Sequence, residues 1–191
     1  MRTQHGGRGV WRGFLKPALA GWAAGLWLVF ACTVAQAQDI VTDDRSQAVA
    51  QTVFAILGYT RWPVEPQTVR LCVLGPTEYA DELLKGGALP SGRLVVVRRM
   101  RMDDPKIPAE CNGVYAGILA DESWRLLLSR LDGQPLLTIS ERKALCHIGG
   151  MFCLDVQPGG VAFEVNLDSV ARSGVRVNPR VLQLARRKGQ P

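Results

Sequence analysis

Residues 113–139 read GVYAGILADESWRLLLSRLDGQPLLTI, and this stretch contains the structural unit that decides the fold. Its two ends, residues 113–119 and 136–139, are short apolar runs typical of buried strands. Between them, Asp121 or Ser123 can begin a helix that continues through Leu128. A strand, a helix and a second strand in this order are typical of a parallel sheet covered by helices.

The chain before this unit shows the same alternation. A first helix is expected to end at Gly58, and a strand at 69–75, a helix at 77–84 and a buried strand at 94–97 follow it. Thr77 is the expected cap of the second of these helices. Because the strands are almost continuously apolar, they suit a mostly parallel sheet that is buried on both faces.

The C-terminal part has a different pattern. Strands at 151–156 and 161–166 flank the turn sequence QPGG at 157–160, which predicts an antiparallel hairpin. A short helix at 167–172 and a last helix beginning near Pro179 complete the chain. The sequence therefore predicts a single α/β domain with a mostly parallel central sheet, helices on both faces and a C-terminal antiparallel hairpin.

The first 37 residues have the features of a secretory signal peptide. An apolar run at 18–34 ends at Ala35-Gln36-Ala37, and it follows four cations without any acid: Arg2, Arg8, Arg12 and Lys16. This order predicts export and cleavage after Ala37, which leaves residues 38–191 as the mature domain, expected in the periplasm. An uncleaved anchor and a lipoprotein modified at Cys32 are the alternatives.

Most of the net positive charge belongs to this leader. Its four cations are part of the net charge of +6, so the mature chain carries +2. From residue 172 onward the chain has six basic residues and no acid: Arg172, Arg176, Arg180, Arg186, Arg187 and Lys188. Because an exported protein rarely meets nucleic acid, these cations indicate a solvated helix face or a contact with an acidic partner.

Four cysteines remain after cleavage: Cys72, Cys111, Cys146 and Cys153. An even number in an oxidising compartment predicts two disulfides, but three pairings are possible and spacing alone does not choose among them. In doubly wound sheets the first strand commonly lies between the second and third, which would bring Cys72 beside Cys111. Cys146 and Cys153 would then form a local clasp.

The mature sequence contains none of the common enzyme motifs. It lacks a Gly-x-Ser-x-Gly elbow, a Gly-x-Gly-x-x-Gly turn, a phosphate loop and a Cys-x-x-Cys pair. Cys146, His147 and Cys153 could ligate zinc only if the thiols stayed reduced. We therefore expect no catalytic site, metal or cofactor, and we expect the domain to act by binding proteins. A periplasmic small-molecule sensor, with its ligand at the carboxyl ends of the strands, is the alternative.

The alternation of the hairpin strands separates two kinds of side chain. If Phe163 fills the core, its neighbour Glu164 points outward. Phe152 lies one residue from Cys153, and the pattern leaves open whether it is buried or is presented to a partner by the clasp. An exposed aromatic beside a charge is typical of a protein-binding hot spot.

Longer motifs add a resemblance to a known family. Residues 146–154 (CHIGGMFCL) and 165–186 (VNLDSVARSGVRVNPRVLQLAR), with upstream matches at 58–63 (GYTRWP), 71–73 (LCV) and 111–115 (CNGVY), resemble the YfiR family of periplasmic regulators. The resemblance implies a homodimer that represses an inner-membrane diguanylate cyclase, YfiN, and so lowers cyclic di-GMP and biofilm formation. Capture by an outer-membrane lipoprotein, YfiB, is implied to relieve the repression.

The same resemblance implies site residues. The disulfides would join Cys72 to Cys111 and Cys146 to Cys153, and the surface that faces the lipoprotein would include Phe152, Glu164 and Val170. We hypothesise that the 146–153 clasp fixes the Phe152 surface, so that its reduction weakens regulation.

Overall fold

The structure is a computed structural model that describes residues 44–187, with side chains as far as residue 184. The predicted signal peptide and its cleavage site lie outside these residues, and so do the side chains of Arg186, Arg187 and Lys188. A first helix covers residues 44–58 and ends at Gly58, as the sequence predicts.

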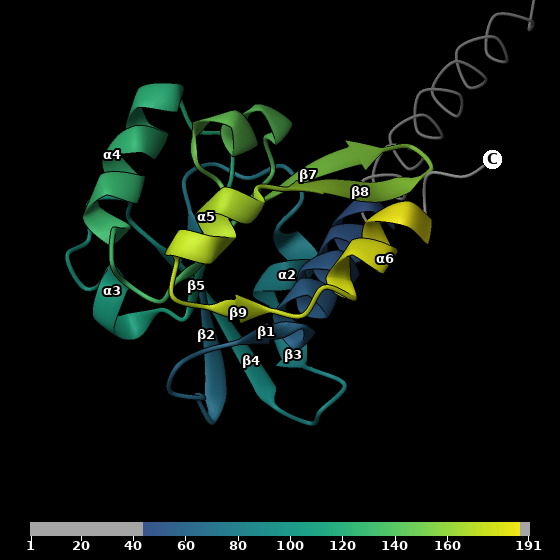
Figure 1. Cartoon of the computed structure of the whole chain (residues 1–191). Coiled ribbons are helices and arrows are strands. Elements are labelled where there is room, and N and C mark those ends of the chain that lie inside the picture. Colours follow the sequence, from purple (N-terminus) through teal and green to yellow (C-terminus); the bar gives the residue numbers. More distant parts are fainter. Residues whose placement is uncertain (1–43, 188–191) are drawn as a thin grey trace, which may run out of the picture. The chain divides into compact units, whose positions relative to one another are not determined.

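A central sheet runs through the domain in the strand order β3-β4-β2-β5-β6-β7-β8 (Figure 1). Five neighbouring strands are parallel: β4 (Leu94–Met100), β2 (Thr68–Leu74), β5 (Gly113–Ala116), β6 (Leu137–Ser140) and β7 (Phe152–Gln157). The edge strands β3 (Gly87–Ala88) and β8 (Gly160–Val165) are antiparallel to β4 and β7. The predicted α/β fold class is confirmed, and β2 lies between β4 and β5 as in doubly wound sheets.

Strand alternation divides the interior into two cores. On β2, Leu71 and Val73 pack in one core and Cys72 and Leu74 in the other. The first helix, α2 (Asp81–Leu84) and α6 (Val181–Arg187) cover the first core, and α3 (Ile107–Glu110), α4 (Asp121–Leu131) and the 3-10 helix η1 (Lys143–Ile148) cover the second (Figure 1). Burial of apolar side chains on both faces explains why the strands are so uniformly apolar.

A second, two-stranded sheet pairs β1 (Thr60–Arg61) with β9 (Arg176–Val177). Asn178 extends the pairing by donating its N–H to the carbonyl of Tyr59 at 2.9 Å. This small sheet holds the segment between α5 (Leu167–Arg172) and α6 against the end of the first helix. Two-residue strands are too short to show a hydrophobic period, so the sequence did not indicate them.

The prediction of a helix at 77–84 is wrong for its first turn. The side chain of Thr77 accepts a hydrogen bond from Arg99 Nη2 at 2.8 Å instead of capping a helix. The N–H groups of Glu78 and Tyr79 donate to the carboxylate of Glu141, both at 2.9 Å. These tertiary bonds satisfy the two N–H groups, and helical structure begins only at Asp81.

The strand predicted as buried at 94–97 is longer and more exposed than expected. It continues to Met100, and Leu94 and Val96 are 58% and 51% exposed. On this face α3 has only four residues, so it leaves the amino-terminal part of β4 uncovered. Arg98 and Arg99 fit near the sheet edge, where charged side chains also discourage pairing with another chain.

Two disulfides fasten the sheet. Cys72 on β2 is joined to Cys111, which lies two residues before the start of β5. The two cysteines are 39 apart in sequence, and their Cα–Cα distance is 5.9 Å. Cys146 of η1 is joined to Cys153 of β7. These are the same pairs that strand order and the family resemblance suggest.

Candidate partner-binding site

The hairpin β7–β8 and α5 hold the three residues expected to face a partner. Glu164 lies on β8, Val170 on α5 and Phe152 at the start of β7. Glu164 and Val170 are both partly exposed, whereas Phe152 is completely buried. The structure therefore brings two of the three residues to the surface.

Phe152 is part of the core that lies under the first helix. Its neighbour on β8 is Val165, and the centroid of its ring lies 5.8 Å from that of Phe163. Cys153 points to the opposite face because successive residues of a strand alternate. The idea that the clasp presents Phe152 to a partner is therefore wrong for this conformation.

Glu164 belongs to a small exposed group of charges. Lys143 Nζ lies 3.0 Å from Glu164 Oε1 and 3.5 Å from Asp155 Oδ2. The hydrogen bond to Glu164 raises the pKa of Lys143, while a hydrogen bond from Gln157, together with the charge of Lys143, lowers the pKa of Asp155. One lysine between two carboxylates leaves a net negative charge, which suits contact with a basic group.

Asn166 links the clasp to this surface. Its side chain donates from Nδ2 to the carbonyl of Cys146 at 2.9 Å and accepts from the N–H of Ser169 at 2.9 Å. The second bond caps α5, so the disulfide turn and the helix that carries Val170 share one side chain. Asparagine directly before the predicted helix at 167–172 was the available signal for this cap, and our reading of the sequence missed it.

Glycine is required inside the clasp. A Cβ atom on Gly150 would lie 3.0 Å from the carbonyl oxygen of Leu145 and 3.1 Å from Cys153 Sγ. Gly149 has φ of +101°, a conformation that residues with a side chain rarely adopt. The two glycines thus allow η1 to end and β7 to begin within the short loop that the disulfide closes.

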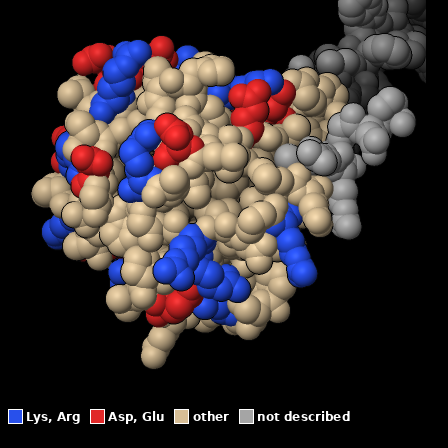
Figure 2. All heavy atoms as spheres, viewed as in Figure 1, with Lys and Arg blue, Asp and Glu red and all other residues tan. Residues whose placement is uncertain are grey.

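Val170 lines an apolar hollow of about 200 Å³ between β8, α5 and α6. Its other side chains are apolar except for Asn178, and Leu167 and Leu182 at its rim are 64% and 38% exposed. On the face shown in Figure 2, charged residues gather in small groups of mixed sign, with uncharged surface between α5 and α6. Exposed apolar side chains next to polar ones are typical of surfaces that bind proteins.

Glu164 and the hollow lie on opposite faces of the same strand. Val165 lines the hollow, and its neighbour Glu164 points to the side of Lys143. Because β8 is the edge strand of the sheet, a partner lying along it can contact both faces. We therefore define the hairpin-edge surface as Glu164, Leu167, Val170 and Leu182.

The carboxyl ends of β2 and β5, where doubly wound sheets commonly bind ligands, are closed by the chain itself. The N–H of Ile118 donates to the carbonyl of Pro76 at 2.7 Å, and Gly117 donates to Leu74 at 3.0 Å. A Cβ on Gly75 would lie 2.3 Å from the side chain of Leu119. The expected location for a small-molecule ligand is therefore occupied by protein.

A half-buried carboxylate, Glu141, holds these loops together. It accepts hydrogen bonds from the hydroxyl of Tyr115 at 2.9 Å and from the N–H groups of Glu78 and Tyr79. Burial raises the pKa of Glu141 although these donors oppose the shift, and burial also raises the pKa of Tyr115. Glu141 thus satisfies the backbone N–H groups of residues 78–79 and ties them to the strand end at Tyr115.

We expect the contribution of Glu141 to stability to fall as pH rises. Because its folded-state pKa lies above the ordinary value of 4.5, the folded protein binds more protons than the unfolded chain between these two values. Stability then decreases with rising pH, by at most about 1.4 kcal/mol per pH unit for one proton. Urea unfolding of wild type and Glu141→Gln at successive pH values would check this, since the difference isolates this carboxyl group. A pH-independent difference would contradict it.

The fold defines a disulfide-bonded α/β domain with a mostly parallel central sheet. The family model described as YfiR/HmsC-like (DUF4154) matches residues 46–186, and the chain belongs to this family. Membership indicates a periplasmic regulator of cyclic di-GMP signalling, in a family that is regulatory rather than catalytic. Within residues 44–187, no helix is long and apolar enough to cross a membrane.

Proposed function

We propose that this protein is exported and represses a YfiN-like inner-membrane diguanylate cyclase by binding its periplasmic part. Repression lowers cyclic di-GMP and, through it, biofilm formation. A YfiB-like outer-membrane lipoprotein relieves repression by capturing the protein at the hairpin-edge surface. The working unit is expected to be a homodimer, as the family resemblance implies.

The exposed hairpin-edge surface is the observation that supports capture by a protein. Leu167 is 64% exposed beside a hollow of about 200 Å³, and a side chain from a partner can fill such a space. The net negative group of Lys143, Asp155 and Glu164 lies across the same edge strand. Apolar contact would then supply affinity, and the charges would favour a partner with a basic rim.

Relief of repression by capture requires that the lipoprotein and the cyclase bind this domain with different affinities or at overlapping surfaces. A ligand shifts an equilibrium only through differential affinity, so the active lipoprotein must outcompete the cyclase for this domain. No catalytic group is needed for this regulation. The clasp contributes by holding Asn166, and through it α5, in the binding conformation.

Cellular cyclic di-GMP tests the repressor role. Deletion of the gene should raise cyclic di-GMP, and restoring the exported chain should reverse the rise, whereas a chain lacking residues 1–37 should not. If deletion changes nothing while the cognate cyclase is present and active, the proposed function is wrong and a small-molecule sensor becomes the better interpretation.

Leu167→Asp should weaken capture by the lipoprotein about tenfold or more, because a carboxylate would enter the apolar contact. Since Leu167 is 64% exposed, folding should be unaffected. Titration calorimetry with the purified lipoprotein would measure the change. Leu126→Asp is the matched control, because Leu126 is 58% exposed on α4, away from this surface.

The same variant separates the two partners in cells. If the hollow binds the lipoprotein alone, Leu167→Asp keeps cyclic di-GMP low even when the lipoprotein is activated. A constant rise in cyclic di-GMP would instead place the cyclase at this hollow. Unchanged capture by Leu167→Asp would exclude the hairpin-edge surface from lipoprotein binding.

A further inference from the structure

A second cavity lies at the other end of the sheet, beside the amino ends of β2 and β4. Its volume is about 720 Å³, within the range of small-ligand sites. Arg70 of β2 and Val96 of β4 are direct neighbours in the parallel register and line the cavity. The short helix α3 leaves this part of the sheet uncovered, which explains the exposure of Val96.

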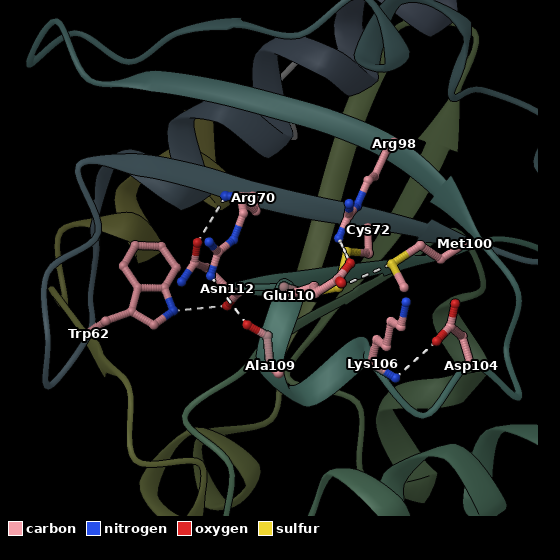
Figure 3. Close-up of a disulfide and its surroundings, with 11 residues drawn as sticks. Trp62, Arg70, Cys72, Arg98, Met100, Asp104, Lys106, Ala109, Glu110 and Asn112 are labelled. Carbon is pink, nitrogen blue, oxygen red and sulfur yellow. Dashed lines mark hydrogen bonds and ion pairs between the residues drawn. A yellow bond between two sulfur atoms is a disulfide. The ribbon is translucent and has the colours of Figure 1, made fainter.

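Hydrogen bonds order the walls of this cavity (Figure 3). Trp62 donates from its indole Nε1 to the carbonyl of Asn112 at 2.8 Å, and the side chain of Asn112 accepts the N–H of Arg70 at 2.9 Å. Asn112 directly follows Cys111, so the disulfide to Cys72 holds this corner in place. Trp62 is almost fully buried, and the wall therefore exists before any ligand arrives.

Arg70 is an exposed arginine on the wall of this cavity, and its charge is not neutralised by an acid. Its guanidinium donates from Nη2 to the carbonyl of Ala109 at 3.3 Å, and no carboxylate of the described chain lies within ion-pair distance. The nearby Glu110 is paired with Arg98, and none of the described residues that line the cavity is acidic. An arginine with free donors in an acid-free cavity is a ready partner for a planar carboxylate.

Most of the remaining lining is apolar, and its polar residues, Gln67, Thr68 and Asn112, are uncharged. Four prolines, Pro63, Pro66, Pro108 and Pro135, surround the arginine together with Trp62 and Val96. Rigid apolar walls lose little conformational entropy on binding, and they contact the body of a ligand rather than its charge. A single cation balances the single charge of a carboxylate.

We propose that this cavity binds a carboxylate carried on an apolar body. Arg70 pairs with the carboxylate, and Trp62, Val96 and the prolines contact the apolar part. A free organic acid and the C-terminal carboxylate of a peptide share this chemistry. The site shares no residue with the hairpin-edge surface, so it is a second and separate binding site.

NMR titration of the exported, signal-free chain tests the site. The probes are phenylacetate, hexanoate and a short peptide ending in a free phenylalanine carboxylate, each beside its uncharged amide. Acids should shift the indole N–H resonance of Trp62, and the amides should not. Arg70→Gln should weaken binding about tenfold, which corresponds to about 1.4 kcal/mol, and Arg70→Lys should restore part of it.

Arg125→Gln is the matched control, because Arg125 is an exposed arginine on α4 outside the cavity. Binding of the free acids supports a small-molecule site, and binding of the peptide alone supports a site for a protein terminus. If no acid binds, if the amides bind equally well, or if Arg70→Gln binds like wild type, the proposal is overturned. Repression of the cyclase is measured separately, so neither result depends on the proposed function.

Discussion

Replacing Cys72 and Cys111 together with alanine is expected to lower the free energy of unfolding by about 4 kcal/mol, from the chain entropy of the loop that the disulfide closes. The bond joins positions 39 apart in sequence and therefore restricts the unfolded chain strongly. Alanine is preferred over serine because Cys72 is fully buried and Cys111 is 4% exposed. Urea unfolding of the oxidised wild type and the double variant measures the loss.

The clasp provides the control. Cys146 and Cys153 are only 7 apart in sequence, so the same model predicts a loss of about 2 kcal/mol for their double variant. The double variant of the clasp should also be captured more weakly by the lipoprotein, because Asn166 donates a hydrogen bond to the carbonyl of Cys146. Equal stability losses for both pairs would contradict the loop-length argument. A clasp variant that represses and binds partners like wild type would refute a regulatory role for this disulfide.

Phe152→Ala is the second change with a large expected effect. Phe152 is fully buried and packs against Phe163, and removing a buried phenylalanine ring typically costs about 3–5 kcal/mol. Partner binding should weaken only as far as the hairpin is distorted or unfolded. Urea unfolding together with a binding titration at a temperature where the variant is folded would separate the two effects.

Phe152→Leu keeps most of the apolar volume and is the milder control. It should cost less than Phe152→Ala in stability and should leave capture by the lipoprotein intact. If Phe152→Leu abolished capture while the protein stayed fully folded, Phe152 would have to reach the partner directly. The hairpin would then adopt a second conformation when it binds.

The elements that follow from local sequence patterns were predicted well. Hydrophobic periodicity and the positions of glycine and proline correctly predicted three elements: the helix that ends at Gly58, the hairpin around residues 157–160, and α5. The position of β2 between β4 and β5 also followed, because a strand–helix alternation allows few sheet orders. The side chains of Glu164 and Val170 reach the surface.

Features that depend on partners distant in sequence could not be predicted. Residues 77–80 contain a good helix cap, but the Thr77 hydroxyl accepts a hydrogen bond from Arg99 instead of capping a helix. The next two N–H groups donate to the carboxylate of Glu141. The exposure of Val96 and the cavity around Arg70 depend on how short α3 is and on where it packs. Local propensity carries no information about such contacts.

Phe152 shows the difference between what the local sequence determines and what tertiary packing determines. The sequence alone determined that an aromatic residue lies beside a disulfide cysteine in an alternating strand, and this pattern fits either face of the hairpin. Only the packing of β7 between β6 and β8, under the first helix, decided that Phe152 is buried. Burial is decided by what covers each face of a strand, and the covering elements here come from the opposite end of the chain.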